Sequence, residues 1–353
     1  AGRGSNGRYN AKGTHLSGSR WGRRGPLFFF LFFCSPAGRG RLAGPGAREK
    51  NAAGAELNVA AGCAQLGLSA AFLSRLPQNA LGAFLAAQAR EHGVSDQLLL
   101  WDESPAARLG VYYYEQASAP RKPAVVYDRR HSSFCSLSPE DLPPRAEGRL
   151  FHTSGITLAL GEGPRRAAAG LMEAFRRQGG LVSFDVNYRA ALWGEAEARA
   201  AIEPLLPLVD VLFVSEESLR RMFGRTGALE DIQREFAAQY GLRYVFSTRR
   251  QALTPTRHQF TSLAYDREAG QTFTEEPYEI DVVDRVGSGD SYTAGVLAGL
   301  LQGGGARRAM RLGNAMAALK CTVPGDLPRT SLAEAERLMA AHGSSLPQSE
   351  MDR

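Results

Sequence analysis

The sequence predicts an α/β fold in which a mainly parallel β-sheet is covered by helices on both faces. Short continuous apolar runs alternate with helical patterns from residue 54 onward, as expected for buried parallel strands joined by helices. Polar residues follow several of these runs, and ligands of such sheets bind beyond the carboxyl ends of the strands. A glycine-rich turn at residues 287–290 then opens a helix of small and apolar residues. The length of 353 residues suffices for one large domain or two small ones.

The expected elements follow one another regularly along the chain. Helical patterns cover residues 57–66, 80–92, 167–177, 195–206, 216–223 and 229–240. Strand patterns cover residues 112–114, 124–127, 150–152, 181–185, 209–214 and 244–246. The first two strands are separated by Pro120 and Pro123, which is typical of a hairpin or a two-strand flap. Four polar residues fall at or just past strand ends, so one crevice is expected to collect Asp185, Asn187, Ser215 and Thr248.

Residues 1–50 differ in character from the rest of the chain. They are rich in Gly, Arg and Ser, with one apolar burst at residues 27–33. The burst is too short for the ~20 residues of a membrane-spanning helix. Its flanks, Arg23-Arg24 and Ser35-Pro36-Ala37-Gly38, imitate a signal peptide, but the burst lies well inside the chain. We therefore expect residues 1–50 to be a disordered segment outside the folded core.

Composition excludes several classes of function. The net charge of +6 comes largely from arginines in the first fifty residues, and no nucleic-acid recognition motif accompanies it. The four cysteines are far apart, which indicates isolated thiols in a reducing compartment: Cys34, Cys63, Cys135 and Cys321. The six histidines show no metal-ligand spacing, so the sequence predicts no zinc site.

The turn at residues 287–290 is the most informative feature of the sequence. Gly287 and Gly289 let the backbone approach a ligand closely, and the following helix directs free N–H groups at the turn, which suits a phosphate. Asp290 stands at the mouth of this anion site, where a carboxylate can accept the proton of an attacking hydroxyl. The alternative is an Asp-capped turn at an ordinary helix start. The flanking Asp284, the expected strand before the turn and the small-residue helix after it favour the functional interpretation.

Four segments in order resemble signatures of the ribokinase-like (pfkB) carbohydrate kinases. Residues 284–290 resemble the second signature, D-x-x-G-A-G-D, with Ser288 in place of Ala. Residues 53–60 resemble the first, G-G-A-x-x-N-x-A, with Ala53 in place of its first glycine. Residues 185–189 resemble a D-x-N-x-R element, and residues 318–326 an A-L-K-x-x-x-P-G-D segment, of the 2-keto-3-deoxygluconate kinases. The resemblance covers residues 51–341.

This resemblance implies a ribokinase-like three-layer sandwich with a mainly parallel sheet and a small β lid. The kinase domain is then expected at residues 51–345, with lid strands near 110–130 and a tail at 346–353. The implied reaction is ATP-dependent phosphorylation of 2-keto-3-deoxygluconate at its terminal hydroxyl, with Asp290 as general base and Mg²⁺ bridging the ATP phosphates. The implied partners are a sugar acid and ATP, without nucleic acid or membrane, in a cytoplasmic protein for which a homo-oligomer is one expected state.

The resemblance also assigns site residues. Those expected near the transferred phosphate or ATP are Gly287, Ser288, Gly289, Asn187, Arg189, Thr248 and Arg249. Those expected to bind the sugar acid are Gly54, Asn58, Tyr112, Tyr127, Arg129, Arg189, Asp284 and Asp290. The guanidinium of Arg129 can bind a carboxylate through two parallel hydrogen bonds. A neutral sugar has no carboxylate and cannot form this interaction. The alternative is that Arg129 and Arg130 are solvated lid charges.

Two departures from the family pattern leave other functions open. No strand like the family's first one is expected within residues 1–50, and its loss would expose a sheet edge. The family's N-x-x-E magnesium element aligns with Ser215-Glu216-Glu217-Ser218, where Glu216 or Glu217 is the candidate substitute. The alternative functions are a kinase for another sugar, such as fructose or ribose, and a catalytically impaired sugar- or nucleotide-binding protein.

Overall fold

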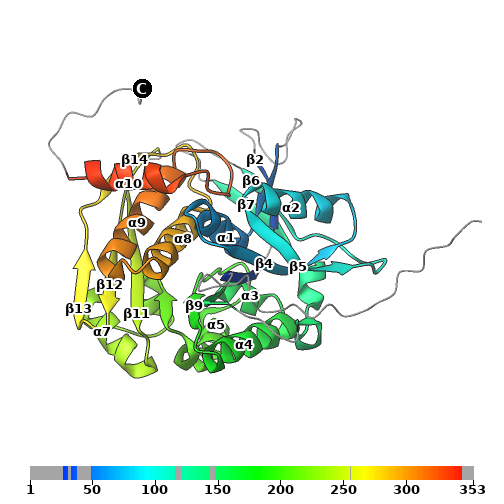
Figure 1. Ribbon diagram of the computed structural model, residues 1–353, viewed down its shortest axis with the longest axis horizontal. Coiled ribbons are helices and arrows are strands. Elements are labelled where there is room, and N and C mark those ends of the chain that lie inside the picture. The colour runs from blue at the N-terminus through cyan, green and yellow to red at the C-terminus, as the bar shows by residue number, and fades with distance from the viewer. Residues whose placement is uncertain are drawn as a thin grey trace, which may run out of the picture.

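The computed structural model describes residues 49–115, 121, 123–143, 148–254 and 256–343, and the backbone of residues 27–30 and 33–37. Within these residues, helices cover both faces of a ten-stranded sheet, and a second sheet of four strands lies at one side (Figure 1). The α/β fold predicted from the sequence is therefore confirmed.

The large sheet is mainly parallel. Its strands are β1 (Leu27–Phe30), β4 (Ala70–Pro77), β5 (Val94–Asp102), β8 (Leu150–Ser154), β9 (Leu181–Asp185), β10 (Val211–Phe213), β11 (Tyr244–Ala252), β12 (Arg257–Asp266), β13 (Gln271–Thr274) and β14 (Tyr278–Asp281). They follow the order β13-β12-β11-β10-β9-β8-β1-β4-β5, with β14 paired to β12. All pairs from β5 to β11 are parallel, whereas β12 runs antiparallel to β11, β13 and β14.

Two groups of helices form the outer layers, which are visible on either side of the sheet in Figure 1. One layer contains α1 (Ala55–Gln65), α2 (Ala80–Glu91), α8 (Ser288–Leu301), α9 (Gly305–Lys320) and α10 (Leu332–Ala341). The other contains α3 (Gly155–Ala159), α4 (Glu162–Arg177), α5 (Glu195–Ile202), α6 (Glu216–Arg221) and α7 (Leu229–Tyr240). Three short 3₁₀ turns complete the described helical structure: Ser133–Ser136, Pro139–Asp141 and Glu203–Leu208.

Strand residues alternate between the two hydrophobic cores that these layers enclose. In β10, Val211 and Phe213 pack with the layer of α1 and α8, whereas Leu212 packs with the layer of α4 and α7. Successive side chains of a strand point to opposite faces, so a strand buried on both sides reads as a continuous apolar run. This geometry explains why the apolar runs predicted these strands.

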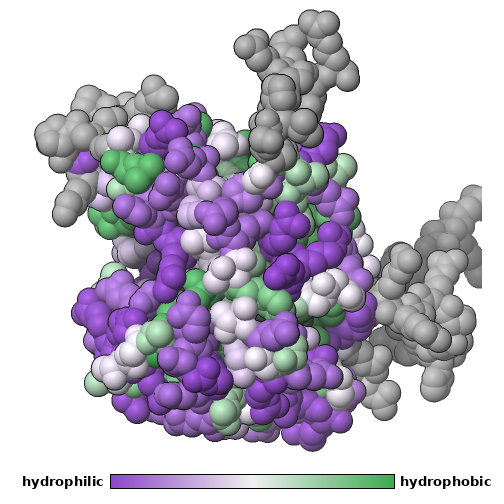
Figure 2. Space-filling model, turned by 90° about the vertical axis from the view of Figure 1, so that its left-hand side faces the viewer, coloured by the Kyte–Doolittle hydropathy of each residue, from purple (hydrophilic) through white to green (hydrophobic). Residues whose placement is uncertain are grey.

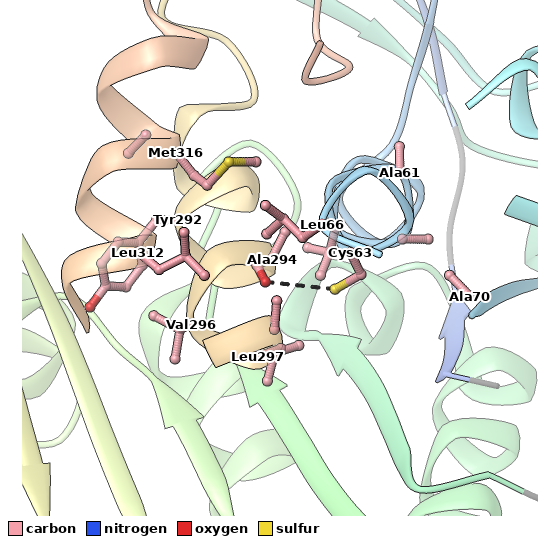
Figure 3. Close-up of a cluster of buried hydrophobic side chains, with 14 of the residues drawn as sticks. Ala61, Cys63, Leu66, Ala70, Tyr292, Ala294, Val296, Leu297, Leu312 and Met316 are labelled. Carbon is pink, nitrogen blue, oxygen red and sulfur yellow. Dashed lines mark hydrogen bonds between the residues drawn. The ribbon is translucent and has the colours of Figure 1, made fainter. Parts of the chain in front are cut away.

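Small residues bring α1 and α8 into close contact. A Cβ atom added at Gly62 in α1 would lie 2.5 Å from Cβ of Ala294 in α8. The Cys63 Sγ donates a hydrogen bond to the Ala294 carbonyl oxygen at 3.7 Å, within a cluster of buried side chains from both helices (Figure 3). The two helices therefore lie side by side, and their first turns belong to the same cavity described below.

The small sheet forms the lid that the sequence predicts near residues 110–130. Its strands are β3 (Glu49–Ala53), β2 (Phe33–Ala37), β6 (Val111–Glu115) and β7 (Ala124–Asp128), in the order β3-β2-β6-β7. The predicted hairpin is confirmed, since β6 and β7 pair antiparallel with Tyr112 opposite Tyr127. The lid is larger than predicted because β2 pairs with both β3 and β6.

The expectation that no first strand precedes residue 51 is wrong. Strand β1 lies between β4 and β8 and is parallel to both, with Leu27 opposite Ala70 and Leu150. The apolar burst at residues 27–33 is too short to span a membrane, but a run of four to eight apolar residues suits a buried strand. Residues 1–26, 31–32 and 38–48, and the predicted tail at 346–353, lie outside the described residues. The domain boundary near residue 51 thus remains a prediction, although strands on both sides of it belong to the fold.

Candidate active site

A cavity of about 640 Å³ lies where the carboxyl ends of β9, β10 and β11 meet the lid and the first turns of α1 and α8. It collects most of the predicted site residues: Gly54, Asn58, Tyr112, Tyr127, Arg129, Asn187, Arg189, Thr248, Gly287, Ser288, Gly289 and Asp290. Asp284 and Arg249 do not line it. The position agrees with the rule that ligands of parallel sheets bind beyond the carboxyl ends of the strands.

The glycine-rich turn forms the start of α8, as the sequence predicts. Gly287 caps the helix with φ of 78° and ψ of −2°, a left-handed conformation that side chains disfavour. A Cβ atom there would also lie 2.1 Å from the Asp326 carbonyl oxygen, so the two loops are in contact. A Cβ added at Gly289, by contrast, would meet no atom within 4 Å. The first N–H groups of the helix and its positive dipole end therefore border open space in the cavity, which suits an anion.

Asp290 is the third residue of α8, and Asn58 of α1 holds its carboxylate. The Asn58 side-chain amide donates a hydrogen bond to Oδ2 of Asp290 at 2.7 Å. Burial raises the pKa of Asp290 to about 6, while the Asn58 hydrogen bond and the charges of Arg189 and Lys320 act in the opposite direction. A carboxylate with this pKa is ionised at neutral pH and is a stronger base than an ordinary aspartate.

Two further carboxyl groups line the cavity: Asp185, which the sequence places in the crevice without assigning it a role, and Asp326, which is not among the predicted site residues. Burial raises the pKa of Asp185 to about 7; the Asp290 charge adds to this, and the Asn187 N–H opposes it by donating to Oδ1 at 3.0 Å. Burial likewise raises the pKa of Asp326 to about 7. Both had a sequence signal, because Asp185 ends an expected strand and Asp326 ends the P-G-D segment.

Glu56 lies behind this group, fully buried in the first turn of α1. Its Oε1 accepts hydrogen bonds from the hydroxyls of Ser154 and Thr157, both at 2.8 Å. Burial raises the pKa of Glu56 to about 8, and the Asp290 charge contributes in the same direction. Glu56 does not line the cavity.

Lid side chains form one wall of the cavity. Arg129 is 3% exposed, and the Cζ atom of its guanidinium lies 3.7 Å from the centroid of the Tyr127 ring. The Tyr112 ring lies 5.8 Å from the Tyr127 ring, and its hydroxyl donates a hydrogen bond to Oδ2 of Asp326. Arg129 is therefore a buried cation on an aromatic support, and the alternative of a solvated lid charge is wrong for this residue.

Several cations converge on the same space. Burial lowers the pKa of Arg129 to about 10, and the charge of Arg189 lowers it further. Burial also lowers the pKa of Arg250, with Arg285 and Arg189 contributing. Arg250 and Arg285 line the cavity and were not among the predicted site residues. Repulsion among guanidinium groups is relieved by a bound anion, so this side of the cavity is suited to carboxylate and phosphate groups.

Asn187 and Thr248 reach the cavity for different backbone reasons. Asn187 follows β9 in a left-handed conformation with φ of 37°, which is uncommon outside glycine. Such conformations concentrate at functional sites. Thr248 lies within β11, which continues to residue 252, well beyond the predicted end at 246. Its side chain reaches the cavity from the strand itself and not from a loop.

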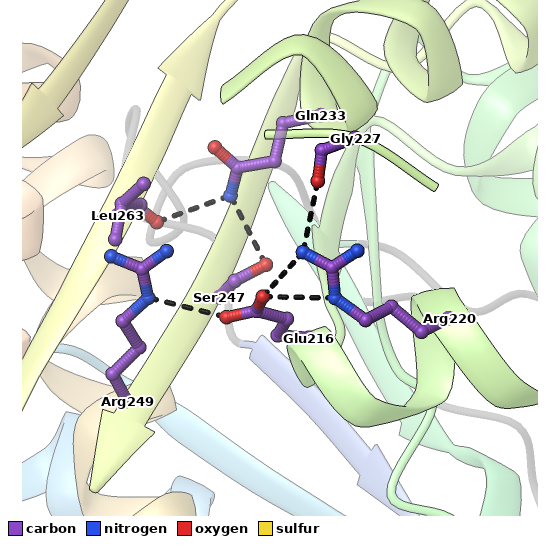
Figure 4. Close-up of polar contacts among 7 residues, drawn as sticks. All are labelled: Glu216, Arg220, Gly227, Gln233, Ser247, Arg249 and Leu263. Carbon is purple, nitrogen blue, oxygen red and sulfur yellow. Dashed lines mark hydrogen bonds and ion pairs between the residues drawn. The ribbon is translucent and has the colours of Figure 1, made fainter. Parts of the chain in front are cut away.

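The Arg249 side chain forms an ion pair with Glu216 and does not line the cavity. Its Nε donates to Oε2 of Glu216 at 3.3 Å, and Oε1 of the same carboxylate accepts from Nη2 of Arg220 at 2.7 Å (Figure 4). This network engages Glu216, one of the two candidates for the magnesium element. The other, Glu217, lines the cavity and pairs with Arg221 at 2.9 Å.

Asp284 fixes the glycine-rich turn from behind. Its Oδ1 accepts the Val286 N–H at 3.0 Å, and its Oδ2 accepts the Gly325 N–H at 3.1 Å. The carboxylate thus joins the turn to the loop that contains Asp326. In this arrangement Asp284 positions the anion site through backbone contacts and does not itself line the cavity.

Across the described ranges, no group of three or more His, Cys, Asp and Glu side chains could hold a metal ion. In the same part of the chain, no helix has the length and apolar character needed to cross a membrane.

On the face shown in Figure 2, hydrophilic residues cover most of the surface, and hydrophobic residues gather in the hollow at its middle.

Known proteins share this fold and sequence pattern. Residues 39–331 match the pfkB family of carbohydrate kinases. A 2-dehydro-3-deoxygalactonokinase from Haloferax volcanii is 37% identical over 294 residues, which cover 82% of this chain and 88% of that relative. A 2-dehydro-3-deoxygluconokinase from Bacillus subtilis is 29% identical over 292 residues, covering 79% of this chain and 83% of the relative. The crystal structure of the 2-dehydro-3-deoxygluconokinase from Thermotoga maritima aligns with a TM-score of 0.84 at 32% identity, covering 89% of this chain and 97% of that one.

Proposed function

Because the chain belongs to the pfkB family of carbohydrate kinases, we propose that it transfers the γ-phosphoryl group of ATP to the terminal hydroxyl of a 2-keto-3-deoxy sugar acid. The family match and the structural alignment confirm the ribokinase-like fold that the sequence resemblance implies. Two relatives carry the names of kinases for the gluco and galacto forms of this acid. One observation carries the proposal: a buried base at the start of α8 shares a cavity with a buried arginine on the lid.

In the proposed reaction, Asp290 accepts the proton of the terminal hydroxyl as its oxygen attacks the γ-phosphorus of ATP. The bond from the γ-phosphorus to the bridging oxygen breaks, and ADP leaves. Negative charge on the transferring group is stabilised by N–H groups at the start of α8, which act strongly in a site shielded from water. The hydrogen bond from Asn58 orients the Asp290 carboxylate without taking its proton-accepting capacity.

The other end of the sugar acid is assigned to the lid. The Arg129 guanidinium, which lies over the Tyr127 ring, is proposed to donate two hydrogen bonds to the carboxylate. Arg189 supplies a second positive charge beside it. Gly54, Tyr112 and Asp326 are the proposed contacts for the carbon chain and its hydroxyls. A neutral sugar has no carboxylate for the Arg129 guanidinium to bind in bidentate fashion, which disfavours fructose and ribose.

Mg²⁺ enters this proposal as the partner of ATP. Magnesium in phosphoryl-transfer sites is held by one or two carboxylates together with phosphate oxygens and water, so the lack of a larger acidic cluster in the described residues agrees with it. Asp185 fits best, because its buried carboxyl is close enough to Asp290 for their charges to repel. Glu217 is the second candidate, since Glu216 is engaged by Arg220 and Arg249. The ion would neutralise charge on the phosphates.

We propose that the protein acts in the cytoplasm, where ATP is found and thiols stay reduced. The three described cysteines, Cys63, Cys135 and Cys321, are free thiols, as expected in that compartment. A homo-oligomer stays a prediction. The impaired-protein alternative was based on a missing first strand, which β1 now supplies. The other-sugar alternative remains the competitor to be tested.

A coupled ADP-release assay tests the proposal directly. Purified full-length protein with Mg-ATP is offered 2-keto-3-deoxygluconate, its galacto epimer, fructose and ribose at equal concentrations. We expect turnover of one or both keto acids and a kcat/KM for neutral sugars lower by at least ~10²-fold, because a specific charge-assisted contact is lost. Equal or better turnover of fructose or ribose would contradict the assignment.

A further inference from the structure

A buried lysine lies directly behind the anion site. Lys320 is the last residue of α9 and is 0% exposed. Its ammonium donates to two backbone carbonyl oxygens, that of Asp284 at 3.4 Å and that of Val323 at 3.2 Å. Burial lowers the pKa of Lys320, while the nearby carboxylates of Asp284, Asp326 and Asp290 raise it. A buried cation is costly unless it is paired, so this position demands an explanation.

The two carbonyl groups belong to the two loops that build the anion site. Asp284 precedes the glycine-rich turn, and Val323 belongs to the loop that leads to Asp326. These loops touch where a Cβ at Gly287 would collide with the Asp326 carbonyl oxygen. Backbone hydrogen bonds also join them, from the N–H groups of Val283 and Asp284 to the Cys321 carbonyl oxygen.

The local charges favour a cation at this point. Lys320 ends α9, where the negative end of the helix dipole stabilises positive charge. Carbonyl oxygens converging on a charge from two loops are also the ligands that proteins use for potassium ions. The Lys320 ammonium therefore has the surroundings of a bound monovalent cation, but it is tethered to the chain.

We propose that the Lys320 ammonium serves as a built-in monovalent cation that holds the 284–287 turn against the 321–326 loop, so that the anion site forms without a free monovalent ion. Lys320 is a positioning residue, because it contacts neither the cavity nor the proposed substrates. It acts through the N–H groups at the start of α8. Its effect is expected on the phosphoryl-transfer step and on nucleotide binding more than on the lid.

Replacement of the ammonium by a dissolved ion tests this proposal. Lys320→Ala removes Cγ, Cδ, Cε and Nζ and leaves room for a small cation between the two carbonyl groups. In choline chloride we expect kcat to fall by roughly 10²-fold, the size of the loss of one oxyanion-hole donor. Addition of K⁺ or NH₄⁺ at constant ionic strength should restore most of the loss. Wild type should keep the same kcat in choline and in potassium chloride.

Two other variants separate charge from packing. Lys320→Met keeps most of the side-chain volume without the charge and leaves no room for an ion, so K⁺ should not rescue it. Lys50→Ala is the matched control, because the Lys50 ammonium lies over the Phe84 ring away from the cavity and should give wild-type rates in both salts. Thermal melts of every variant in both salts report folding independently of turnover.

The outcomes are distinct. Wild-type kcat in Lys320→Met, loss in Lys320→Ala that no small cation restores, or a potassium requirement of the wild type would each overturn the proposal. The turnover readout rests on the proposed kinase function. Calorimetric Mg-ATP binding by the same variants supplies a readout that needs no sugar. Wild type that neither turns over any keto acid nor binds Mg-ATP would refute the proposed function instead.

Discussion

The substitution Asp290→Asn should strongly reduce turnover and stabilise the folded protein at the same time. Asparagine keeps the size of the side chain and can still accept the hydrogen bond that Asn58 donates at 2.7 Å. It accepts no proton, so kcat should fall by ~10²–10⁴-fold while Mg-ATP still binds. The wild-type carboxyl has its pKa raised from 3.8 to about 6 by burial. Because each tenfold change in proton affinity is worth ~1.4 kcal/mol, the ionised form costs the folded state up to about 3 kcal/mol.

The sign of the pH dependence follows from the same raised pKa. Folded Asp290 binds its proton more tightly than the unfolded chain does, so its contribution to stability is lost as pH rises from about 4 to 6. The Asn variant lacks this loss and should melt at a higher temperature than wild type above pH 6. Conversely, wild-type kcat/KM should decline by roughly tenfold per pH unit below pH 6, as the base becomes protonated.

Thermal melts between pH 5 and 8 and steady-state rates over the same range measure both effects. Asn58→Asp serves as a second variant, since it replaces the amide donor by a carboxylate facing Asp290 and should impair both rate and stability. An Asp290→Asn protein with near wild-type kcat, or one that is less stable than wild type at pH 8, would refute the reasoning.

Four further predictions concern Arg129 of the lid, Gly287 of the glycine-rich turn, strand β1 and Arg249. Arg129→Ala should raise the KM for the keto acid by about 10- to 100-fold, because a charge-assisted pair worth roughly 1.5–3 kcal/mol is lost; an unchanged KM in steady-state kinetics would return Arg129 to a structural role. Gly287→Ala should lower the melting temperature and prevent Mg-ATP binding in calorimetry, since its Cβ would lie 2.1 Å from a carbonyl oxygen at φ of 78°. A chain that begins at Asn51 should show no cooperative thermal transition, because removal of β1 leaves β4 and β8 without their shared partner; a stable, active fragment would show that β1 is dispensable. Arg249→Ala should change kcat/KM by less than about threefold, as expected of an exposed ion pair worth under 1 kcal/mol, and a larger loss in the coupled assay would assign it to ATP.

The sequence was most informative where local chemistry determines local structure. The glycines at 287 and 289 predicted a turn at a helix start, and the continuous apolar runs predicted the parallel strands β8 to β11. Asp290, Asn58 and the lid residues Tyr127 and Arg129 were placed in one cavity as the family motifs implied.

Features that depend on tertiary contacts escaped sequence reasoning. Strand β1 was missed because its partners, β4 and β8, are distant in sequence and were needed to recognise it. Arg249 was assigned to phosphate because only the fold reveals its partner Glu216. In the sequence, Lys320 is only one residue of the 318–326 motif. Its proposed positioning role depends on the two carbonyl groups that its ammonium contacts in the fold.

We propose that a buried base and a buried arginine in one cavity make this chain a sugar-acid kinase. The most direct measurement is the kcat/KM of wild type and Arg129→Ala for 2-keto-3-deoxygluconate and for fructose in one coupled assay. Wild type should strongly prefer the keto acid, and Arg129→Ala should lose most of this preference by losing activity on the acid alone. Equal loss on both sugars, or a wild-type preference for fructose, would contradict it.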